Sequence, residues 1–522
     1  MSQFVTVQVG QCGNQIGSAF WPLVLHEYGV QTTSGSVNLL KTHKNYGRNS
    51  KELAEAFNSF FHVPDHRGDF AFKHVSDLEL ARVKARAVLI DMEDSVVGRF
   101  RQGPLRNLFD QTCTVTNYPG SGNNWFLNFC YYFDVPLIER TEDTAVGYYT
   151  HGIEYHNKLE ETIRRTVEKC DCLHGFLVTH SLGGGTGSGL GTATLKLLDD
   201  YYPQVDRSIQ NYFSYCQTIR SPCTILIINF YRFVSCVYPA STQDVITAPY
   251  NVLLATRELI EHATCVFPAE NRALQDMCNV YMNNRRENVD QAKYNASCLP
   301  FQDMNSIIVN MLLHLTSGSR FPGCLNTDMN ELATNLVAYP QLHYIFSSVS
   351  PVALTASQIS TTNGTKYQDE LFTNAWSRNN QLIKVDPLQS GSLVIGAAHI
   401  YRGDSSLTDI RRNIERFQNK AKFTSWSKEA MKIGLCSVPP AGHPASLLCM
   451  MNSTSMSLLF KDIIQQFDRL YKKKAHIHHY LQVDQFEKED FIESRERIVS
   501  VFERYNKIEK QNPVSISRLQ LK

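Results

Sequence analysis

The stretch THSLGGGTGSGLGTATLKLL, residues 179–198, contains a run of glycine, threonine and serine from 183 to 189. The apolar segment GFLVTH, at 175–180, precedes the run, and a helical pattern follows it. Glycine admits positive φ and lets a ligand approach the backbone, so successive N–H groups can converge on an anion at a helix N-terminus. The run therefore predicts a phosphate-binding loop. Its candidate contacts are Ser181, Gly183, Gly184, Gly185, Thr186 and Gly187, with the hydroxyls of Thr186 and Ser188 as further donors.

The run does not match the two common phosphate-binding motifs. No GK[ST] follows it, and its spacing is not GxGxxG with an acid about twenty residues later. The second absence counts against a nucleotide-dependent oxidoreductase, which stays open as an alternative. A tight strand-to-helix turn is the plainest interpretation, but such a turn does not need so many glycines.

Two further glycine loops follow strand-like segments. The loop GQCGNQ follows the segment 4–9, and GSGNNW lies at 120–125. Each alone is equally well explained as a plain turn. Loops that follow parallel strands meet at one edge of a sheet, so we expect them to line one crevice with the glycine run. They add the candidates Gly10, Gln11, Cys12, Gln15, Gly122 and Asn123.

Two acids end the apolar segment AVLIDME. Asp91 and Glu93, together with Gln11, could hold Mg²⁺ through water, because Mg²⁺ keeps several waters and takes few carboxylates. A helix-capping acid is the competing explanation. We expect Glu93 also to line the nucleotide crevice.

The order of segments predicts the fold class. Apolar runs at 87–91, 175–180, 233–237 and 265–268 alternate with helical patterns, which is typical of a doubly wound parallel α/β sheet. We expect this nucleotide-binding Rossmann-like domain at 1–300, a core helix with an α+β domain at 301–454, and a helical region at 455–522. In the second domain, strands are predicted at 343–347 and 393–401.

Two segments fit this pattern poorly. Residues 126–144 interrupt a glycine loop, and residues 207–230 run into the next apolar strand without a turn residue. The resulting apolar run exceeds the usual strand length of about 5–6 residues. We interpret both as insertions, either lineage-specific loops or translated intron sequence.

Composition excludes several classes of protein. The 522 residues carry a formal net charge of +1, so the overall charge does not favour binding to nucleic acid or to an anionic membrane. No apolar stretch reaches the roughly 20 residues of a membrane span. The 14 cysteines lack zinc-type CxxC blocks, and we expect free thiols in a soluble intracellular protein. Zinc binding by His476, His478 and His479 is disfavoured because no cysteine or carboxylate lies at a matching spacing.

Four motifs resemble the tubulin superfamily. They are GQCGNQIG at 10–17, SGNNW at 121–125, GGGTGSG at 183–189 and RFPGCLNTDMNELATNLVAYPQLHY at 320–344. Within the superfamily the chain is most similar to the epsilon-tubulin branch, through ARAVLIDME, QGPLR, DIRRNIER, LCSVPPAGH and LYKKKAHIHHYLQV. The resemblance implies a tubulin-like fold: a GTPase domain, an α+β domain and C-terminal helices.

The resemblance also implies a GTP/GDP site with Mg²⁺. It places Gln11, Cys12, Asn123, Gly184, Thr186 and Gly187 at the phosphates, and Asn271, Phe301 and Asn305 at the guanine. Phe301 stands where most tubulins stack a tyrosine. Asp244 is retained near the ribose, but Ala248 replaces a glutamate there, which puts the sugar contacts in doubt.

Asp328 and Glu331 lie three residues apart in a helix-opening segment. Taken alone, they are helix N-terminal acids that face the dipole. The resemblance implies instead that they act in trans on the nucleotide of the next subunit, where Glu331 would orient the attacking water. The chain would then be an assembly-dependent GTPase.

The epsilon-tubulin resemblance implies a structural protein of the cytoskeleton, in the cytoplasm at centrosomes, centrioles and basal bodies. Such a protein would organise doublet and triplet microtubules, together with delta-tubulin and other tubulin-family subunits. The tail PVSISRLQLK is not acidic, which argues against a general microtubule subunit. That role and a GTP-loaded adaptor that never polymerises remain the alternatives.

Overall fold

The computed structural model describes residues 2–31, 50–64, 70, 72–116, 155–203, 230–240, 245–285, 301–352, 365–481 and 486–510. The segment 126–144 lies outside these residues, and so does 207–230 apart from Phe230. The site candidates Gly122, Asn123 and Asp244 lie outside them as well.

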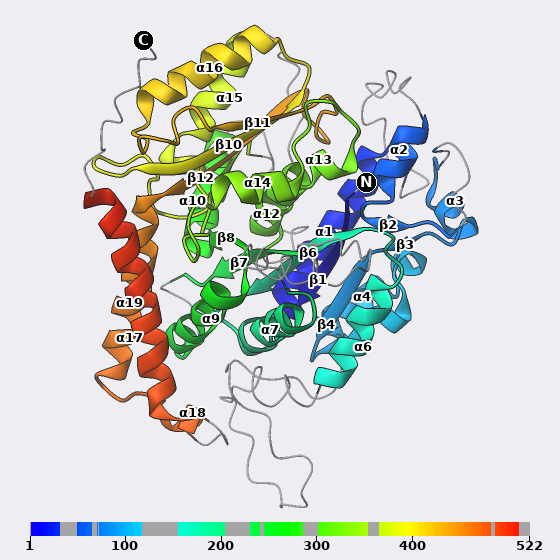
Figure 1. Cartoon of the computed structure of the whole chain (residues 1–522). Helices are drawn as coiled ribbons and strands as arrows, with labels where there is room; N and C mark the ends of the chain where they lie inside the picture. The colour runs from blue at the N-terminus through cyan, green and yellow to red at the C-terminus, as the bar shows by residue number, and fades with distance from the viewer. Residues whose placement is uncertain are drawn as a thin grey trace, which may run out of the picture.

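A six-stranded sheet forms the centre of the first domain (Figure 1), in the order β5-β4-β1-β6-β7-β8. Every neighbouring pair in it is parallel, which confirms the doubly wound α/β class. The strands are β1 (Gln3–Val9), β4 (Ala87–Asp91), β5 (Thr114–Thr116), β6 (Leu173–Ser181), β7 (Tyr231–Tyr238) and β8 (Cys265–Glu270).

Helices cover both faces of this sheet, because its strands are apolar on both sides. Val5, Val7 and Val9 pack into the core under α6, α7 and α9, whereas Phe4 packs into the core under α1 and α12. The helices of this domain are α1 (Gly10–Glu27), α2 (Ser50–Phe57), α3 (Val75–Leu80), α4 (Asp94–Phe100), α6 (His156–Val167), α7 (Gly191–Tyr201), α9 (Ala248–His262) and α10 (Asn271–Arg285). A short antiparallel pair joins β2 (Phe61–His62) to β3 (Lys84–Ala85).

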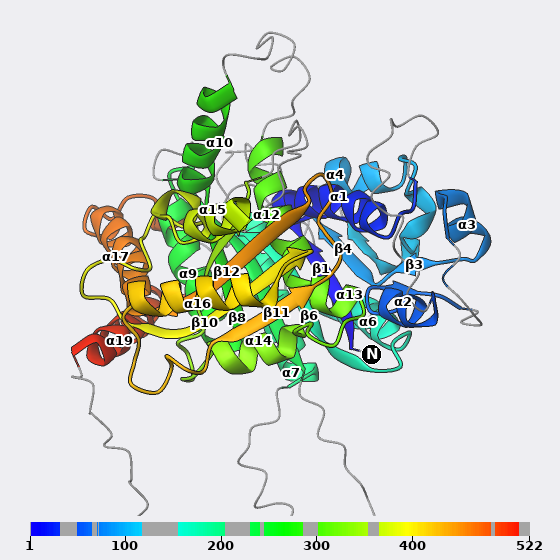
Figure 2. The same cartoon turned by 90° about the horizontal axis from the view of Figure 1, so that it is seen from above.

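A second, mixed sheet follows the core helix α12 (Gln302–Leu315), in the order β11-β10-β12-β9. Figure 2 shows α16 over this sheet. The strands are β9 (Phe346–Ser350), β10 (Val394–Gly403), β11 (Lys432–Cys436) and β12 (Ala445–Ser453), and the helices are α13 (Ser317–Arg320), α14 (Met329–Leu336), α15 (Thr365–Ala375) and α16 (Leu407–Lys420).

The strand expected at 343–347 begins later, at Phe346. The preceding residues bridge to the first sheet instead. Val266 of β8 donates its N–H to the carbonyl of His343 (2.9 Å), and Ile345 donates to the carbonyl of Val266 (2.9 Å). This short segment therefore extends the edge of the parallel sheet before the chain enters the second one.

The C-terminal helices pack against α9 and appear in orange and red in Figure 1. They are α17 (Ser457–Tyr471), the short α18 (His478–Leu481) and α19 (Lys488–Lys510). Among the described residues, no helix has the length and apolar character needed to cross a membrane.

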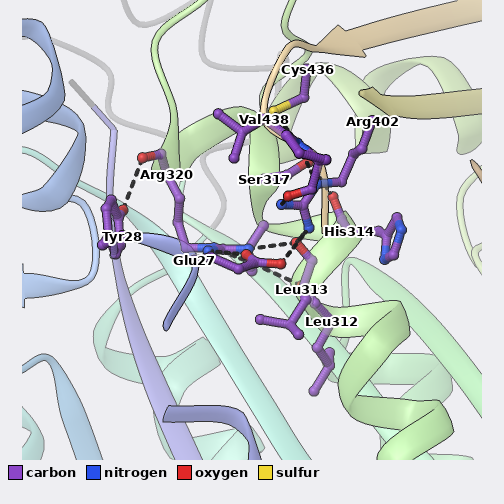
Figure 3. Close-up of polar contacts among 12 residues, drawn as sticks. Glu27, Tyr28, Leu312, Leu313, His314, Ser317, Arg320, Arg402, Cys436 and Val438 are labelled. Carbon is purple, nitrogen blue, oxygen red and sulfur yellow. Dashed lines mark hydrogen bonds and ion pairs between the residues drawn. The ribbon is translucent and has the colours of Figure 1, made fainter. Parts of the chain in front are cut away.

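A buried ion triad holds the last residue of α1 against the second domain (Figure 3). Glu27 contacts Arg320 of α13 (2.7 Å) and Arg402 of β10 (2.8 Å), and all three side chains are fully buried. Burial opposes ionisation of Glu27, but the charges of Arg402 and Arg320 outweigh it and lower the pKa of the carboxyl. Because α1 begins at the predicted nucleotide loop, this triad fixes the far end of a helix that carries the site.

We expect Glu27→Gln to lower the free energy of unfolding by about 3 kcal/mol, since it leaves two buried guanidinium charges without a counter-ion. Glu415→Gln is the matched control, because its pair with Arg411 is exposed and such pairs contribute at most about 0.5 kcal/mol. Denaturant unfolding of both variants measures the difference. Equal losses in the two variants would show that the triad does not stabilise the fold.

His399 of β10 is buried and accepts a hydrogen bond at Nε2 from the indole N–H of Trp376 (3.2 Å). Burial lowers the pKa of His399 to about 4. The unfolded chain therefore binds a proton near pH 6.5 that the folded chain does not, and stability is lost as pH falls from 6.5 towards 4.

For His399 alone, we expect a loss of about 1 kcal/mol between pH 7.5 and 5.5. His399→Gln removes the titrating group, so the free energy of unfolding should lose this part of its pH dependence. The melting temperature should then vary less with pH than that of the unmodified protein. The other buried histidines are present in both proteins, so the comparison isolates His399. Parallel pH profiles for the two proteins would refute the assignment.

Candidate functional site

The carboxyl ends of the parallel strands meet at one edge of the sheet and gather the predicted loops there. In register, Val9 pairs with Ile90, Asp91 with Thr116, Ser181 with Val237, and Tyr238 with Glu270. The first loop, the acids, the glycine run and Asn271 all follow these ends. This edge is where ligands bind in doubly wound sheets.

The first loop touches the glycine run. Gly10 has φ +71°, and a Cβ built on it would lie 3.1 Å from the backbone nitrogen of Gly187. The buried amide of Asn14 donates to the carbonyls of Gly10 and Ile90 (3.0 Å each), which joins this loop to β4. Any side chain at position 10 would therefore push two predicted phosphate loops apart.

The glycine run does not adopt the positive-φ conformation expected to make its N–H groups converge. No described glycine from 183 to 189 has a positive φ; instead, the chain is helical from Gly185 and forms a π-helical turn, η5 (Thr186–Leu190), that leads into α7. Glycine is needed here for close approach, since a Cβ on Gly187 would lie 2.8 Å from the carbonyl oxygen of Ser181. The free N–H groups therefore come from the first turn of a helix.

Ser188 corrects a second expectation. Its buried hydroxyl donates back to the carbonyl oxygens of Gly184 and Gly185 (3.2 Å for Gly185). That hydroxyl stabilises the turn itself, so of the two hydroxyl side chains in the run, only that of Thr186 stays a predicted phosphate contact.

Among the described residues, Gly184 faces open space, since a Cβ added to it would meet none of their atoms within 4 Å. Gly183 beside it is buried, and its carbonyl accepts a hydrogen bond from Asn251 of α9 (3.0 Å). The loop is thus supported from one side and open on the other. Such a cradle fits a phosphate group.

Asp91 is the best-placed candidate for a magnesium ligand. Its side chain is 3% exposed, and its Oδ2 atom has no hydrogen-bond partner among the described residues. Burial raises the pKa of Asp91 to about 7, and the charge of Glu93 adds to the rise. Glu93 and Gln11 are exposed at neighbouring strand ends. A buried carboxylate that keeps Oδ2 without a described partner, while Oδ1 accepts from the N–H of Glu93 (3.3 Å), fits Mg²⁺, which would offset the charge of the phosphates.

The residues expected at the guanine lie on α10 and α12, and one of them meets Gln15 of the first glycine loop on α1. Asn305 donates its amide to Oε1 of Gln15 (3.4 Å), so two predicted contacts from separate helices meet. Phe301 caps α12 in a left-handed conformation (φ 64°) with its ring 54% exposed. Asn271 opens α10 at the end of β8. Cys12 is partly buried, and burial raises the pKa of its thiol to about 12, so it is not a thiolate.

Asp328 and Glu331 lie away from this crevice. Asp328 accepts hydrogen bonds from Ser2 (2.6 Å), just before β1, and from Ser319 and the N–H of Met329 (2.7 Å each). It therefore sits at the amino end of the strand whose carboxyl end carries the site, and its carboxylate caps α14. Glu331 is exposed and pairs with Lys432 of β11 (2.9 Å).

The three histidines of the zinc alternative, which the sequence disfavours, lie close together. The rings of His476, His478 and His479 cluster, with centroids 4.0–6.5 Å apart. Nevertheless, the described residues contain no group of three or more histidine, cysteine or acidic side chains that could hold a metal.

Two residues that support the site were not predicted from the sequence. Asn14 lies inside GQCGNQIG, and its position between two glycines could have marked it as a backbone support. Asn251 lies in the ordinary helical segment APYNVLL, which carries no signal for the role.

Comparisons with known proteins agree with this geometry. The model of the Tubulin/FtsZ family, GTPase domain, matches residues 3–279, and that of the Tubulin C-terminal domain matches 340–465. The chain is 39% identical to the tubulin epsilon chains of Mus musculus and Homo sapiens, over 98% of this chain and 96% of each relative. It is 30% identical to the tubulin alpha-1 chain of Saccharomyces cerevisiae, over 96% of both chains.

Proposed function

The chain belongs to the tubulin family, and from this premise we propose that it is a GTP-binding structural protein of centrioles and basal bodies that organises doublet and triplet microtubules. The observation that carries the nucleotide part is the cradle at Gly184, which is braced by Asn251 and closed by Gly10. The family implies GTP or GDP as the ligand. The centriolar part rests on the likeness to epsilon chains.

We assign the phosphates to Gly10, Gln11 and the run from Gly183 to Gly187. Asp91 and Glu93 would hold Mg²⁺, and Gln15, Phe301 and Asn305 would bind the base. The exposed ring of Phe301 can stack on a purine, because stacking needs the aromatic face and not a hydroxyl. Asn123 and Asp244 remain predicted contacts.

We assign Glu331 to the nucleotide of a neighbouring subunit. The amino edge of the sheet, where Asp328 caps α14, faces away from this subunit's own crevice, so we place its target on a neighbouring chain. Asp328 then holds the helix that presents Glu331. Hydrolysis would need contact between subunits.

Identifying the bound nucleotide tests the nucleotide part. The purified chain is denatured and its nucleotide is separated by chromatography, and we expect GTP or GDP near one per chain. Adenine nucleotide or a nicotinamide cofactor would refute the assignment and favour the oxidoreductase alternative.

Two experiments test the role. Tagged protein should colocalise with centriole markers and copurify with delta-tubulin. Pelleting with GTP, alone and with other tubulin-family subunits, separates an assembling subunit from an adaptor that never polymerises. Incorporation along all microtubules would favour a general microtubule subunit.

A further inference from the structure

The phosphate loop is connected to the C-terminal helices by a chain of buried hydrogen bonds. The hydroxyl of Tyr480, in α18, donates to Oδ1 of Asn251 (2.7 Å), and Nδ2 of Asn251 donates to the carbonyl of Gly183 (3.0 Å). Tyr480 and Asn251 are both fully buried. We propose that Tyr480 is a positioning residue for the nucleotide, a proposal that rests on the GTP site proposed above.

The hydroxyl of Tyr480 fixes which way the Asn251 amide points. The Tyr480 oxygen lies 2.7 Å from Oδ1 of Asn251 and 3.5 Å from the carbonyl oxygen of Thr247, so the shorter contact takes the single phenol proton. With Oδ1 accepting from the phenol, the amide nitrogen is turned towards Gly183. Burial raises the pKa of Tyr480 well above its usual value, so the phenol stays a donor. Without that hydroxyl, Oδ1 would lose its 2.7 Å hydrogen bond, and the amide would be held less firmly in its orientation towards Gly183.

Planarity of the peptide bond carries this orientation to the ligand. The carbonyl of Gly183 and the N–H of Gly184 belong to one trans peptide plane and point in opposite directions. With the carbonyl bonded to Asn251, the N–H of Gly184 must point away from α9. A Cβ added to Gly184 would meet no atom of the described residues within 4 Å, so we place a phosphate oxygen on this open side, within reach of the N–H.

The turn that carries Tyr480 is itself fixed to α9. The hydroxyl of Tyr250 donates to the carbonyl of Ala475 (2.7 Å), and the rings of Tyr250 and Tyr480 meet edge to face at 5.4 Å. Tyr250 therefore ties the same turn to the same helix, but within the described part of the chain its hydroxyl donates to Ala475 and not to the phosphate loop. This makes it a matched control.

The test measures release of a fluorescent GTP analogue from the full-length chain. Tyr480→Phe keeps the ring and removes only the hydroxyl, and we expect about tenfold faster release, the loss of about one hydrogen bond. Tyr250→Phe should release the analogue at the rate of the unmodified protein. Melting temperatures of both variants report any general loosening of the turn.

A double-mutant cycle with Asn251→Ala identifies the route. In that background, Tyr480→Phe should have no further effect, because the amide that transmits it is gone. Unchanged release from Tyr480→Phe, equal acceleration by Tyr250→Phe, or an additive cycle would each overturn the proposal. An unmodified chain that holds no guanine nucleotide would instead refute the GTP site, and the positioning role would fall with it.

Discussion

Gly184→Val is expected to purify as a folded protein without nucleotide. The fold should tolerate the change, because an added Cβ meets no atom within 4 Å in the part of the chain that the structure describes, and the backbone lies outside the left-handed region. The isopropyl group would occupy the open side of the loop and displace a phosphate from several N–H groups together. Since charge-assisted hydrogen bonds contribute about 1.5–3 kcal/mol each, we expect affinity to fall at least about 1000-fold.

Two measurements test this prediction. Nucleotide content per chain reports the loss of nucleotide, and the melting temperature without added nucleotide reports whether the variant is folded. Gly103→Val is the control, since its added Cβ would also find room, 3.7 Å from the nearest atom, in a loop outside the crevice. That variant should keep its nucleotide. Stoichiometric GTP in purified Gly184→Val would show that the glycine run does not hold the phosphates.

The choice of glycine matters for this experiment. A Cβ on Gly13 would lie 2.2 Å from the carbonyl oxygen of Thr179, and one on Gly187 would press on Ser181. Substitutions there would disturb the backbone, so loss of nucleotide could not be separated from loss of fold. Gly184 is the position in the run where the two effects separate.

Much of the fold could be predicted because its signals are local. Continuous apolar runs mark strands that are buried on both faces. The run 87–91 has the predicted bounds, whereas β6, β7 and β8 end one or two residues beyond the predicted runs. The position of β9 could not be predicted, because residues 343–345 satisfy their hydrogen bonds on β8, a partner 77 or more positions earlier in the chain. Strand pairing across domains leaves no periodic trace in a sequence.

The candidate site, like the fold, could be predicted only in part. The loops at Gly10 and Gly183 could be predicted because several glycines between a strand and a helix are unusual and indicate a special backbone requirement. The support behind them could not, because Tyr480 and Asn251 are 229 positions apart, and nothing in the stretch LYKKKAHIHHYLQV around Tyr480 indicates a contact with the phosphate loop. The sequence also assigned positive φ to the glycine run, whereas the structure places it at Gly10 and at the aromatic Phe301.

Asp328 and Glu331 lie in one helix-opening segment but make different contacts. Its sequence position predicts a helix N-terminal acid, and the hydrogen bond from the N–H of Met329 confirms the cap. Glu331, one turn later, contributes nothing to that cap and points its carboxylate to Lys432 at the surface. The two acids therefore separate into a structural residue and a candidate catalytic residue.

Glu331→Ala is expected to slow GTP hydrolysis in assemblies by about 10²–10⁴-fold, the usual contribution of a group that positions and deprotonates water. Nucleotide binding should be unchanged, because Glu331 is far from its own subunit's crevice. Phosphate release from pelleted assemblies measures turnover, and Glu370→Ala, an exposed acid of α15, is the control. Loss of binding in Glu331→Ala would contradict this assignment.

Mixing two defective subunits distinguishes action in trans from action in cis. Gly184→Val lacks a working nucleotide site but keeps Glu331, whereas Glu331→Ala keeps the site and lacks the carboxylate. If Glu331 acts on the neighbouring subunit, co-assembly brings an intact crevice against an intact carboxylate at some contacts, and hydrolysis should reappear there. If it acts within its own chain, no contact in the mixture holds both groups, so the mixture should be as slow as Glu331→Ala alone.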